Sequence, residues 1–322
     1  MKKSLITIVC LTLVLSLVLA FVGCENDIET NYAKYVVMTP DGAPSMALAQ
    51  MMKDNVVFNK SVGEYSLISA DQIKSAFSNG EADFIIAPTN AGVQLSIKTG
   101  NYRLAAVTSW GNLYIVGDGI KSREECDSAQ EFLAQFAGKT VGSIGTGAVP
   151  DVTFKHLLAQ YGVEVTIDPA EAPALQTKLN EGSLDLAILG EPAVTATMTK
   201  VARVKRLANI SELWKEVVGQ DFPQASLFVK KTVDSETANA FMNAVSSSIE
   251  YLNASSANAK ELGEYMESRK DSTLKGAVVA KSYAAMQQKF VKASEVESDV
   301  LAFVTVLGVN VTQDKLDEII LK

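Results

Sequence analysis

Cysteine is scarce in this chain of 322 residues, which contains three. Cys10 and Cys24 lie near the start, so Cys126 is alone in the remainder. One thiol cannot form an internal disulfide, and no two cysteines have the CxxC spacing of redox or zinc motifs. The sequence therefore argues against a disulfide framework and against a metal site with cysteine ligands.

Histidine occurs once, as His156, within a predicted helix at residues 152–158. A Ser/His/Asp triad would have to use this residue, and no Gly-x-Ser-x-Gly motif is present. Receptors for zinc or manganese need more histidines than one. We therefore expect a protein that is not an enzyme and that holds no metal and no cofactor.

Positive charge is also in short supply, with 29 lysines and arginines against 37 acids and a net charge of −8. Loss of Lys2 and Lys3 with the N-terminal segment described next would leave 27 basic residues and a net charge of −10. An acidic body argues against partners such as nucleic acid and against attraction to anionic lipid headgroups.

Long apolar runs are missing except at the start. Lys2 and Lys3 precede an apolar run at residues 5–22, which Gly23 and Cys24 follow. This order is typical of a secretory signal. A cysteine directly after a small residue resembles the lipobox of bacterial lipoproteins, in which the cysteine is acylated and becomes the mature N-terminus. Phe21 departs from the usual leucine.

The lipobox predicts a signal peptide at residues 1–23, lipidation of Cys24 and a tether at residues 24–33. An uncleaved anchor helix is the alternative, because the apolar run could almost span a bilayer. Both interpretations attach the body to the membrane on its extracytoplasmic face. Removal of the 23 signal residues from 322 would leave 299, enough for one large or two medium domains.

Strands and helices alternate, which predicts an α/β fold with mainly parallel sheets. A buried strand at residues 35–38 leads through the loop 39–44 into a helix at about residues 45–52. A capping box at residues 69–72, Ser-Ala-Asp-Gln, predicts the start of the next helix. That helix stops at Gly80, and a strand at residues 84–87 follows.

The same layout occurs a second time. A strand at residues 140–144 leads into the loop 145–150, and a helix at residues 174–180 ends at Gly182 before the strand 184–189. Gly80 and Gly182 are 102 residues apart, as are Asp83 and Asp185. Any α/β protein repeats strand, loop and helix by chance. The shared order favours two similar lobes.

The repeated layout predicts lobe 1 at residues 34–117 and 226–322, and lobe 2 at residues 118–225. The first crossing would lie near residues 117–119, and the return would come after Pro223, at the strand 225–229. From residue 235 onward the pattern predicts a helical C-terminal tail. Because ligands bind beyond the carboxyl ends of parallel strands, the loops of both lobes would line one cleft.

Three segments resemble a known family: TPDGAP at residues 39–44, DFIIAP at residues 83–88 and DLAILGEPA at residues 185–193. They look like the nitrate/sulfonate/taurine-type substrate-binding proteins of ABC importers. That group also binds precursors of the thiamine pyrimidine, and riboflavin. The resemblance covers nearly all of the mature chain. It implies a type II periplasmic-binding fold with two α/β lobes, two hinge strands and closure around a ligand.

Helix starts with small residues, acids, an indole and hydrogen-bonding side chains at a strand end predict the ligand-binding residues. A helix start presents free N–H groups, and the small residues before it let a ligand approach the backbone. An acid in the cleft would favour a cationic solute, although such acids often only cap helices. An indole could stack on a planar ring. The candidates are Thr146, Gly147 and Ala148, Asp41 and Gly42, Glu191, Trp110 with Asn112, and Thr89 with Asn90.

None of these loops contains arginine, which weakens the case for sulfonate and other oxyanions. Two acids and a tryptophan favour an aromatic nitrogen heterocycle or an amine. The expected function is capture of a small organic solute and its delivery to an ABC permease. A ligand-sensing lipoprotein without a transporter is one alternative. A pyrimidine-synthase-like enzyme is another, although such enzymes rely on histidine and a cysteine-rich segment that this chain lacks.

Overall fold

The computed structural model describes residues 32–322, except for the side chain of Ala70. The expected signal, the expected lipidation site Cys24 and nearly all of the expected tether lie outside these residues. Residues Lys34–Lys322 form one compact unit, called the body below. None of the helices in this part of the chain combines the length and the apolar character needed to cross a bilayer.

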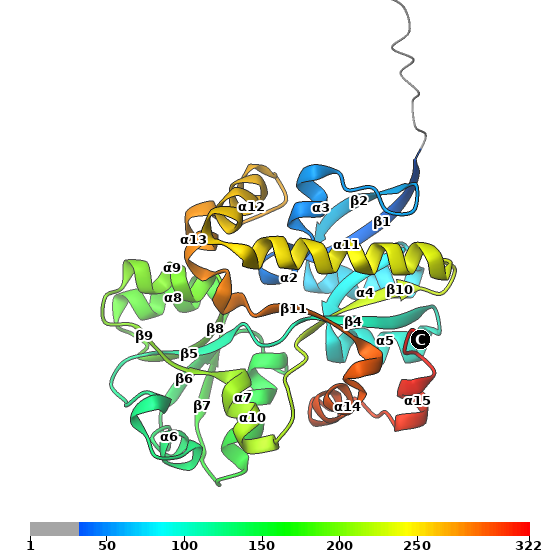
Figure 1. Ribbon diagram of the computed structural model, residues 1–322. Helices are drawn as coiled ribbons and strands as arrows, with labels where there is room; N and C mark the ends of the chain where they lie inside the picture. The colour runs from blue at the N-terminus through cyan, green and yellow to red at the C-terminus, as the bar shows by residue number, and fades with distance from the viewer. Residues whose placement is uncertain (1–31) are drawn as a thin grey trace, which may run out of the picture. The chain divides into compact units, whose positions relative to one another are not determined.

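The body contains two sheets, shown in Figure 1. The first has six strands in the order β11-β4-β10-β3-β1-β2, and the second has five in the order β7-β6-β8-β5-β9. The strands of the first sheet are β1 (Ala33–Pro40), β2 (Ser61–Ile68), β3 (Phe84–Pro88), β4 (Tyr102–Ser109), β10 (Ala225–Lys230) and β11 (Gln288–Lys292). Those of the second are β5 (Leu113–Gly117), β6 (Thr140–Ser143), β7 (Thr166–Pro169), β8 (Leu186–Gly190) and β9 (Lys205–Asn209). We call the elements around the first sheet lobe 1 and those around the second lobe 2.

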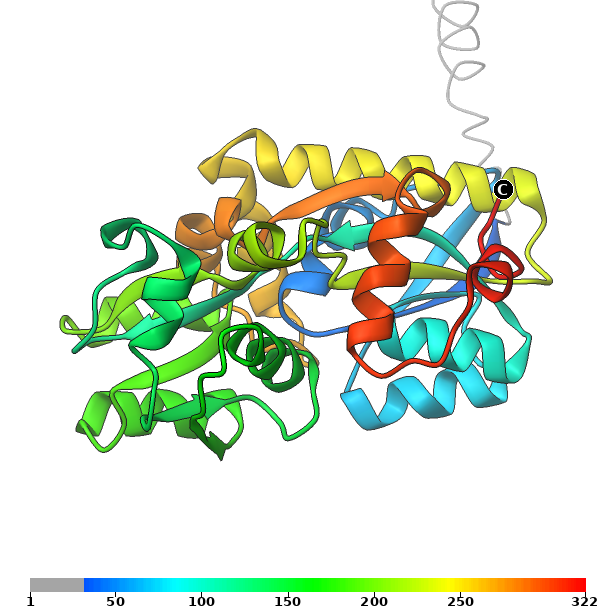
Figure 2. The same cartoon turned by 90° about the horizontal axis from the view of Figure 1, so that it is seen from below.

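Helices connect and cover the strands (Figures 1 and 2). Before the second crossing they are α2 (Ala43–Met46), α3 (Ala49–Asp54), α4 (Ala70–Asn79), α5 (Thr89–Thr99), η1 (Arg123–Glu125), α6 (Ala129–Ala134), α7 (Val149–Ala159), α8 (Ala172–Glu181), α9 (Ala193–Lys200) and α10 (Ile210–Val218). The C-terminal part adds α11 (Ser235–Ala254), α12 (Ser256–Ser268), α13 (Gly276–Ser282), η2 (Ala284–Met286), η3 (Ala293–Glu295), α14 (Glu297–Val306) and α15 (Gln313–Asp317).

Local sequence explains where several helices begin and end. The predicted capping box at Ser69 starts α4, and both of its reciprocal hydrogen bonds are present. Gly80 ends α4 with φ 63°, and Gly182 ends α8 with φ 75°. This left-handed conformation is one that glycine adopts at little cost. The two glycines of the repeat therefore end corresponding helices in the two lobes.

Two expected features of the sheets are wrong. β5 pairs with β8 and β9 in the second sheet, so the first crossing lies at residues 110–112 and not near residues 117–119. The sheets are also mixed and not mainly parallel. β10 and β11 run antiparallel to their neighbours in the first sheet, and β5 does so in the second. These are the strands that enter a lobe by crossing from the other lobe or by returning from the tail.

Two further expectations are wrong in detail. The helix expected at residues 45–52 is divided into α2 and α3, with a break at Ala47 and Leu48. The C-terminal tail is mainly helical, but β11 interrupts it and joins the edge of the first sheet. The chain returns to lobe 1 at β10, which begins at Ala225, as expected after Pro223.

Three apolar clusters hold the body together. One lies in lobe 1, where the rings of Phe84 and Phe241 stack with centroids 3.8 Å apart. A second lies in lobe 2, between β8 and the helices α8 and α9. The third includes residues of both lobes. In it Trp214 of α10 contacts Phe222 and Phe303, so α14 of the tail packs against lobe 2.

Candidate functional site

Gln224, in the second crossing (residues 219–224), forms hydrogen bonds at the ends of one strand from each sheet. The backbone N–H of Thr89, at the start of α5, donates to the Gln224 carbonyl at 3.0 Å. The backbone N–H of Asn112, in the first crossing (residues 110–112), donates to Gln224 Oε1 at 2.9 Å. Gln224 therefore joins the end of β3 in lobe 1 to the start of β5 in lobe 2. No local pattern in the sequence marks this residue as a candidate.

Three buried polar atoms at strand ends of the two sheets have no hydrogen-bond partner among the described residues: Asn90 Oδ1, Asn112 Oδ1 and Ser143 Oγ. Asn90 lies in the first turn of α5, Asn112 precedes β5, and Ser143 ends β6. Leaving a buried polar atom unpaired costs about 1–3 kcal/mol, so such atoms call for an explanation. A bound solute would supply the missing partners. We call these three residues, together with Gln224, the strand-end cluster.

The loop before α7 has the open backbone that the sequence predicts. Gly147 has φ 74°, and no atom lies within 4 Å of the position that a Cβ would take. Thr146 and Gly147 are exposed. The Gly147 N–H, however, donates to Asp151 Oδ2 at 2.8 Å, so Asp151 already satisfies one donor at this helix start. The side chain of Ala148, the N-cap residue, cannot accept a hydrogen bond from the helix.

Asp41 is engaged within lobe 1. Its carboxylate accepts hydrogen bonds from Ser272 Oγ at 3.0 Å, from Thr273 N–H at 2.7 Å and from Thr273 Oγ1 at 2.6 Å. The acid thus fastens the loop after α12 to the loop after β1. Gly42, beside it, has φ 100° and open space where a Cβ would lie. The structure therefore provides a backbone approach at Gly42 but gives Asp41 three internal partners.

Glu191 is also engaged, and its side chain is fully buried. It accepts from the Thr195 N–H and from Thr195 Oγ1, both at 3.0 Å, and it forms an ion pair with Arg206. Arg206 lies on β9 and covers the ring of Tyr114, with its guanidinium carbon 5.0 Å from the ring centroid. Glu191 therefore caps α9 and links β8 to β9 within lobe 2. Asn112 lies next to it, since the Glu191 N–H donates to the Asn112 carbonyl at 2.9 Å.

Trp110 lies in the first crossing and contacts the C-terminal tail. Its Nε1–H donates to the Lys289 carbonyl at 2.9 Å, and the Lys289 ammonium lies 5.9 Å from the ring centroid. The residue lines a hollow of about 300 Å³ together with α10 and β11 residues. Neither the strand-end cluster nor the loop at Thr146 borders that hollow. Thr89 is fully buried, and its hydroxyl lies 2.7 Å from Ser226 Oγ.

The structure thus brings Thr89, Asn112 and Glu191 together around Gln224, with Asn90 adjacent in α5. It gives Asp41 and Trp110 other neighbours. Ser143 and Gln224 were missed because both are single polar residues with no motif around them. Ser143 ends β6, the strand of lobe 2 that corresponds to β1 in the repeated layout, and its position just before the loop 145–150 could have suggested it.

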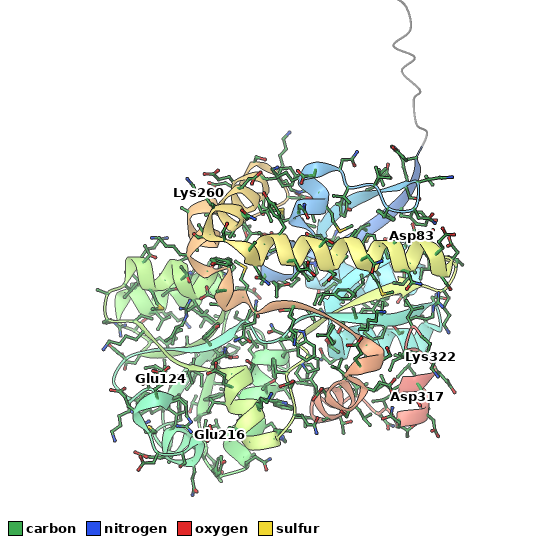
Figure 3. All side chains as sticks on the ribbon, viewed as in Figure 1. Asp83, Glu124, Glu216, Lys260, Asp317 and Lys322 are labelled. Atoms are coloured by element: carbon green, nitrogen blue, oxygen red, sulfur yellow. The ribbon has the colours of Figure 1, made fainter. Side chains whose placement is uncertain are left out.

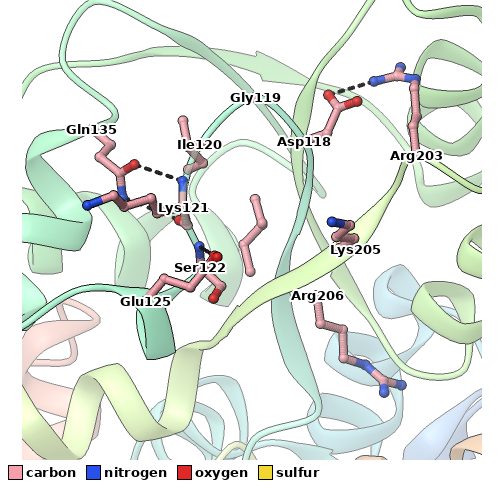
Figure 4. A pocket seen from close by; sticks show the side chains of 11 residues that line it. Asp118, Gly119, Ile120, Lys121, Ser122, Glu125, Gln135, Arg203, Lys205 and Arg206 are labelled. Atoms are coloured by element: carbon pink, nitrogen blue, oxygen red, sulfur yellow. Dashed lines mark hydrogen bonds and ion pairs between the residues drawn. The ribbon is translucent and has the colours of Figure 1, made fainter.

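A hollow of about 770 Å³ lies beside β9 in lobe 2, and Figure 4 shows its lining. Four cationic residues border it, but most of the polar groups here bind one another. Arg203 pairs with Asp118 at 2.9 Å, and Glu125 accepts from the Ser122 N–H at 2.8 Å. In Figure 4 the side chain of Arg206 points away from this group. Its ion-pair partner is Glu191. Of the four cationic residues, Lys121, Arg203 and Arg206 already form ion pairs, and Lys205 forms none with a described residue.

Charged residues elsewhere lie on the outer helices. In Figure 3, Glu216 on α10 and Lys260 on α12 mark two such places. Arg123 donates to Glu216 at 2.7 Å and holds the pKa of that carboxyl below its usual value. Among the described residues no three histidine, cysteine or acidic side chains lie close enough together to hold a metal ion.

Solved structures resemble this body closely in fold. An ABC transporter structure from Parabacteroides distasonis matches with a TM-score of 0.70 and 18% identity, covering 90% of this chain and 96% of that one. The alkanesulfonate-binding protein of Xanthomonas axonopodis pv. citri, bound to MOPS, matches with a TM-score of 0.63 and 13% identity, covering 87% and 95%. The nitrate-binding protein of Synechocystis PCC 6803 matches with 0.61 and 13%, covering 90% and 85%.

The chain has the type II periplasmic-binding fold. No family model matches the sequence, and no curated protein matches it significantly. At identities of 13–18% the likeness concerns the fold. Asn90 follows the carboxyl end of β3 and Ser143 ends β6, and ligands of open α/β sheets usually bind beyond the carboxyl ends of strands.

Proposed function

We propose that this chain is an extracytoplasmic solute-binding protein of an ABC importer. It would bind a small organic solute between its lobes and deliver it to the permease. The observation that carries the proposal is the strand-end cluster, where atoms from both lobes lie buried without partners. The fold supports it, because the similar structures include the ligand-binding component of an ABC-type import system and an alkanesulfonate-binding and a nitrate-binding protein.

A solute that bridges the lobes would act by population shift. Contacts to Asn90 in lobe 1 and to Ser143 in lobe 2 stabilise only the arrangement in which both residues face the same ligand. A solute that contacted only one lobe would bind the open and the closed arrangement equally well, so it would not drive closure. Open backbone at Gly42 and Gly147 gives each lobe a place where a ligand can approach closely.

The unpaired groups that would recognise the solute are neutral, so we expect the solute to be uncharged. A preference for amines depended on Asp41 and Glu191, and both acids already have partners inside the protein. The unpaired atoms of the strand-end cluster are two amide oxygens and one hydroxyl. Amide oxygens accept from N–H and O–H donors. We infer an uncharged, hydrogen-bonding molecule such as a heterocycle, in preference to an amine.

Mass spectrometry of released small molecules tests the function. The chain would be expressed from Asn26 without Cys24, which retains the whole body Lys34–Lys322. We expect denaturation to release one solute at a stoichiometric amount. If the protein is empty, a thermal-shift screen over heterocycles, amines and sulfonates such as MOPS follows. Absence of any stabilising solute in both experiments would contradict the proposal.

An Asn90→Ala variant tests the site once a solute is found. Loss of one hydrogen bond to the ligand weakens binding by about tenfold, and calorimetric titration measures it. Asn180→Ala, on the exposed end of α8, is the matched control and should bind as the wild type does. Equal affinity of both variants would remove Asn90 from the site.

A lipid anchor at Cys24 is the second part of the proposal. It places the body at the cell membrane with its binding site outside the cytoplasm, next to the permease. We expect the full chain to fractionate with membranes and its N-terminal peptide to carry acyl chains. Cys24→Ala should leave the signal intact but prevent acylation. An unmodified Cys24 in membrane-bound wild-type protein would favour the uncleaved anchor helix.

A further inference from the structure

The C-terminal tail binds the first crossing from the side of lobe 1. The Trp110 N–H donates to the Gln287 carbonyl at 3.1 Å, and Trp110 Nε1–H donates to the Lys289 carbonyl at 2.9 Å. Tyr114 of β5 donates its hydroxyl to the Ala285 carbonyl at 2.8 Å. The tail residues 285–289, which we call the strap, thus hold both ends of the connection between the sheets. The strap comprises the end of η2, Gln287 and the first two residues of β11, an element that Figure 1 labels.

The side chain of Gln287 extends this contact into lobe 2. In the amide orientation that satisfies every neighbour, its nitrogen donates to the Trp110 carbonyl at 3.1 Å and to the Gly111 carbonyl at 3.2 Å. The nitrogen also lies 3.1 Å from Ser211 Oγ, and the oxygen accepts from Asn209 Nδ2 at 2.6 Å. One amide therefore binds the first crossing and the end of β9 at the same time.

The backbone of Gln287 is in a conformation that glutamine rarely adopts. Its φ is 49°, in the left-handed region. A side chain there costs free energy that glycine would avoid, and such strain persists only where the surroundings enforce it. The hydrogen bonds of the amide are a physical reason for a glutamine at this position.

The crossing is shaped to receive this amide. Gly111 has φ 122°, and a Cβ there would overlap Ser211. The backbone of the crossing consequently lies directly against lobe 2, with its carbonyls turned to Gln287. Ser211 donates to Asn209 Oδ1 at 2.8 Å, which leaves Asn209 Nδ2 for the Gln287 oxygen.

We propose that Gln287 is a positioning residue: its amide locks the first crossing to Asn209 and Ser211 and thereby sets how freely the two lobes move. The consequence for a solute rests on the proposed function, because only a ligand held between the lobes would sense this restraint. The lock itself is a property of the unliganded chain.

Hydrogen exchange of the full chain, without added solute, measures the lock. Gln287→Gly removes the amide and relieves the backbone strain. We expect exchange at residues 110–114 and 209–211 to rise about tenfold or more, since several hydrogen bonds are lost together. Exchange in β1 and β3 should not change, and the melting temperature should stay equal or rise. If Gln287 had a purely structural role, its replacement would lower the melting temperature and speed hydrogen exchange throughout the body.

Asn55→Gly is the matched control, because Asn55 has φ 46° at the end of α3 and lies away from the crossing. It should leave exchange at the crossing unchanged. Gln287→Glu is a second variant, in which a carboxylate would face the Trp110 and Gly111 carbonyls, and it should also speed exchange there. Wild-type exchange at the crossing in both Gln287 variants would overturn the proposal. An absence of any solute would count against the proposed function but not against the lock.

Discussion

At the scale of single residues, the buried carboxylate of Glu191 depends on one cation. Its side chain is fully buried, whereas that of Arg206 is 35% exposed. Arg206→Ala would leave a buried charge without its counterion. We expect the free energy of unfolding to fall by about 2–4 kcal/mol, near the lower end of values for a buried ion pair because Arg206 is partly solvated. Urea unfolding measures it.

Lys205→Ala is the control for that variant. Lys205 is the neighbouring residue on β9, it is exposed, and it forms no ion pair with another described residue. Its replacement should change stability by less than about 0.5 kcal/mol. A similar loss in both variants would mean that Glu191 does not depend on Arg206 for its stability.

His156 predicts a pH dependence that can be assigned to one group, because it is the chain's only histidine. Burial lowers its pKa, and its ring lies 5.7 Å from that of Trp214. The unfolded chain binds the proton more readily than the folded one. Stability is therefore complete above the unfolded pKa near 6.5 and falls as the pH drops below it.

His156→Gln should flatten this dependence between pH 7 and pH 5. Urea unfolding at several pH values compares the slope of stability against pH in variant and wild type. Direct titration of the imidazole by NMR gives the folded pKa independently. An imidazole that titrates at or above 6.5 in the folded protein would refute the prediction.

The partners of single side chains could not be predicted from the sequence. Asp41, Glu191 and Trp110 were selected for their positions after strands, and those positions are correct. Their partners are not visible locally: Thr273 lies 232 residues from Asp41, and Lys289 lies 179 residues from Trp110. Whether a side chain faces a ligand or the protein depends on such distant segments.

At the scale of elements, the first crossing tolerates glycine alone at residue 111. Gly111→Ala would combine an unfavourable φ of 122° with an overlap on Ser211. We expect a loss of about 2 kcal/mol or more in the free energy of unfolding. Gly119→Ala is the control, because φ is 79° there but the space is open. It should cost about 1 kcal/mol, and equal costs at both positions would show that the packing against Ser211 is unimportant.

Elements with strong local signals were predicted well. The capping box before α4 and the glycines that end α4 and α8 act within a few residues, so the sequence carries them. Phe241, Val245, Ile249 and Leu252 recur at helical spacing in the sequence, and all four are buried on α11. β11 was missed because its five residues are mostly polar or half-buried and lie at the sheet edge.

At the scale of the whole molecule, the repeated layout was sufficient to predict two α/β lobes, and the family resemblance implied the type II periplasmic-binding fold. It was not sufficient to assign β5. A short apolar strand fits either sheet, and the choice depends on pairing with β8 and β9, whose partner residues lie 69 or more residues further along the chain. The tail's contact with lobe 2 was invisible for the same reason.

That contact predicts how the body unfolds. Trp214 of lobe 2 lies 5.6 Å from Phe222 in the second crossing and 5.8 Å from Phe303 in the tail, between ring centroids. Phe222 and Phe303 are themselves 4.8 Å apart. Because this aromatic bridge is part of an apolar cluster shared by both lobes, we expect one cooperative transition. Circular dichroism and tryptophan fluorescence should then report the same midpoint.

Phe222→Ala should separate the two midpoints, because it removes the ring at the centre of the bridge. Its total cost should be about 3–5 kcal/mol, as for other buried phenylalanines. Phe77→Ala is the control: Phe77 is equally buried but packs on Tyr102 and Phe228 within lobe 1. It should lower a single transition, since the bridge still couples the lobes. If Phe222→Ala also unfolds in one step, cooperativity must come from the strap and the two crossings, and the aromatic bridge would then contribute only stability.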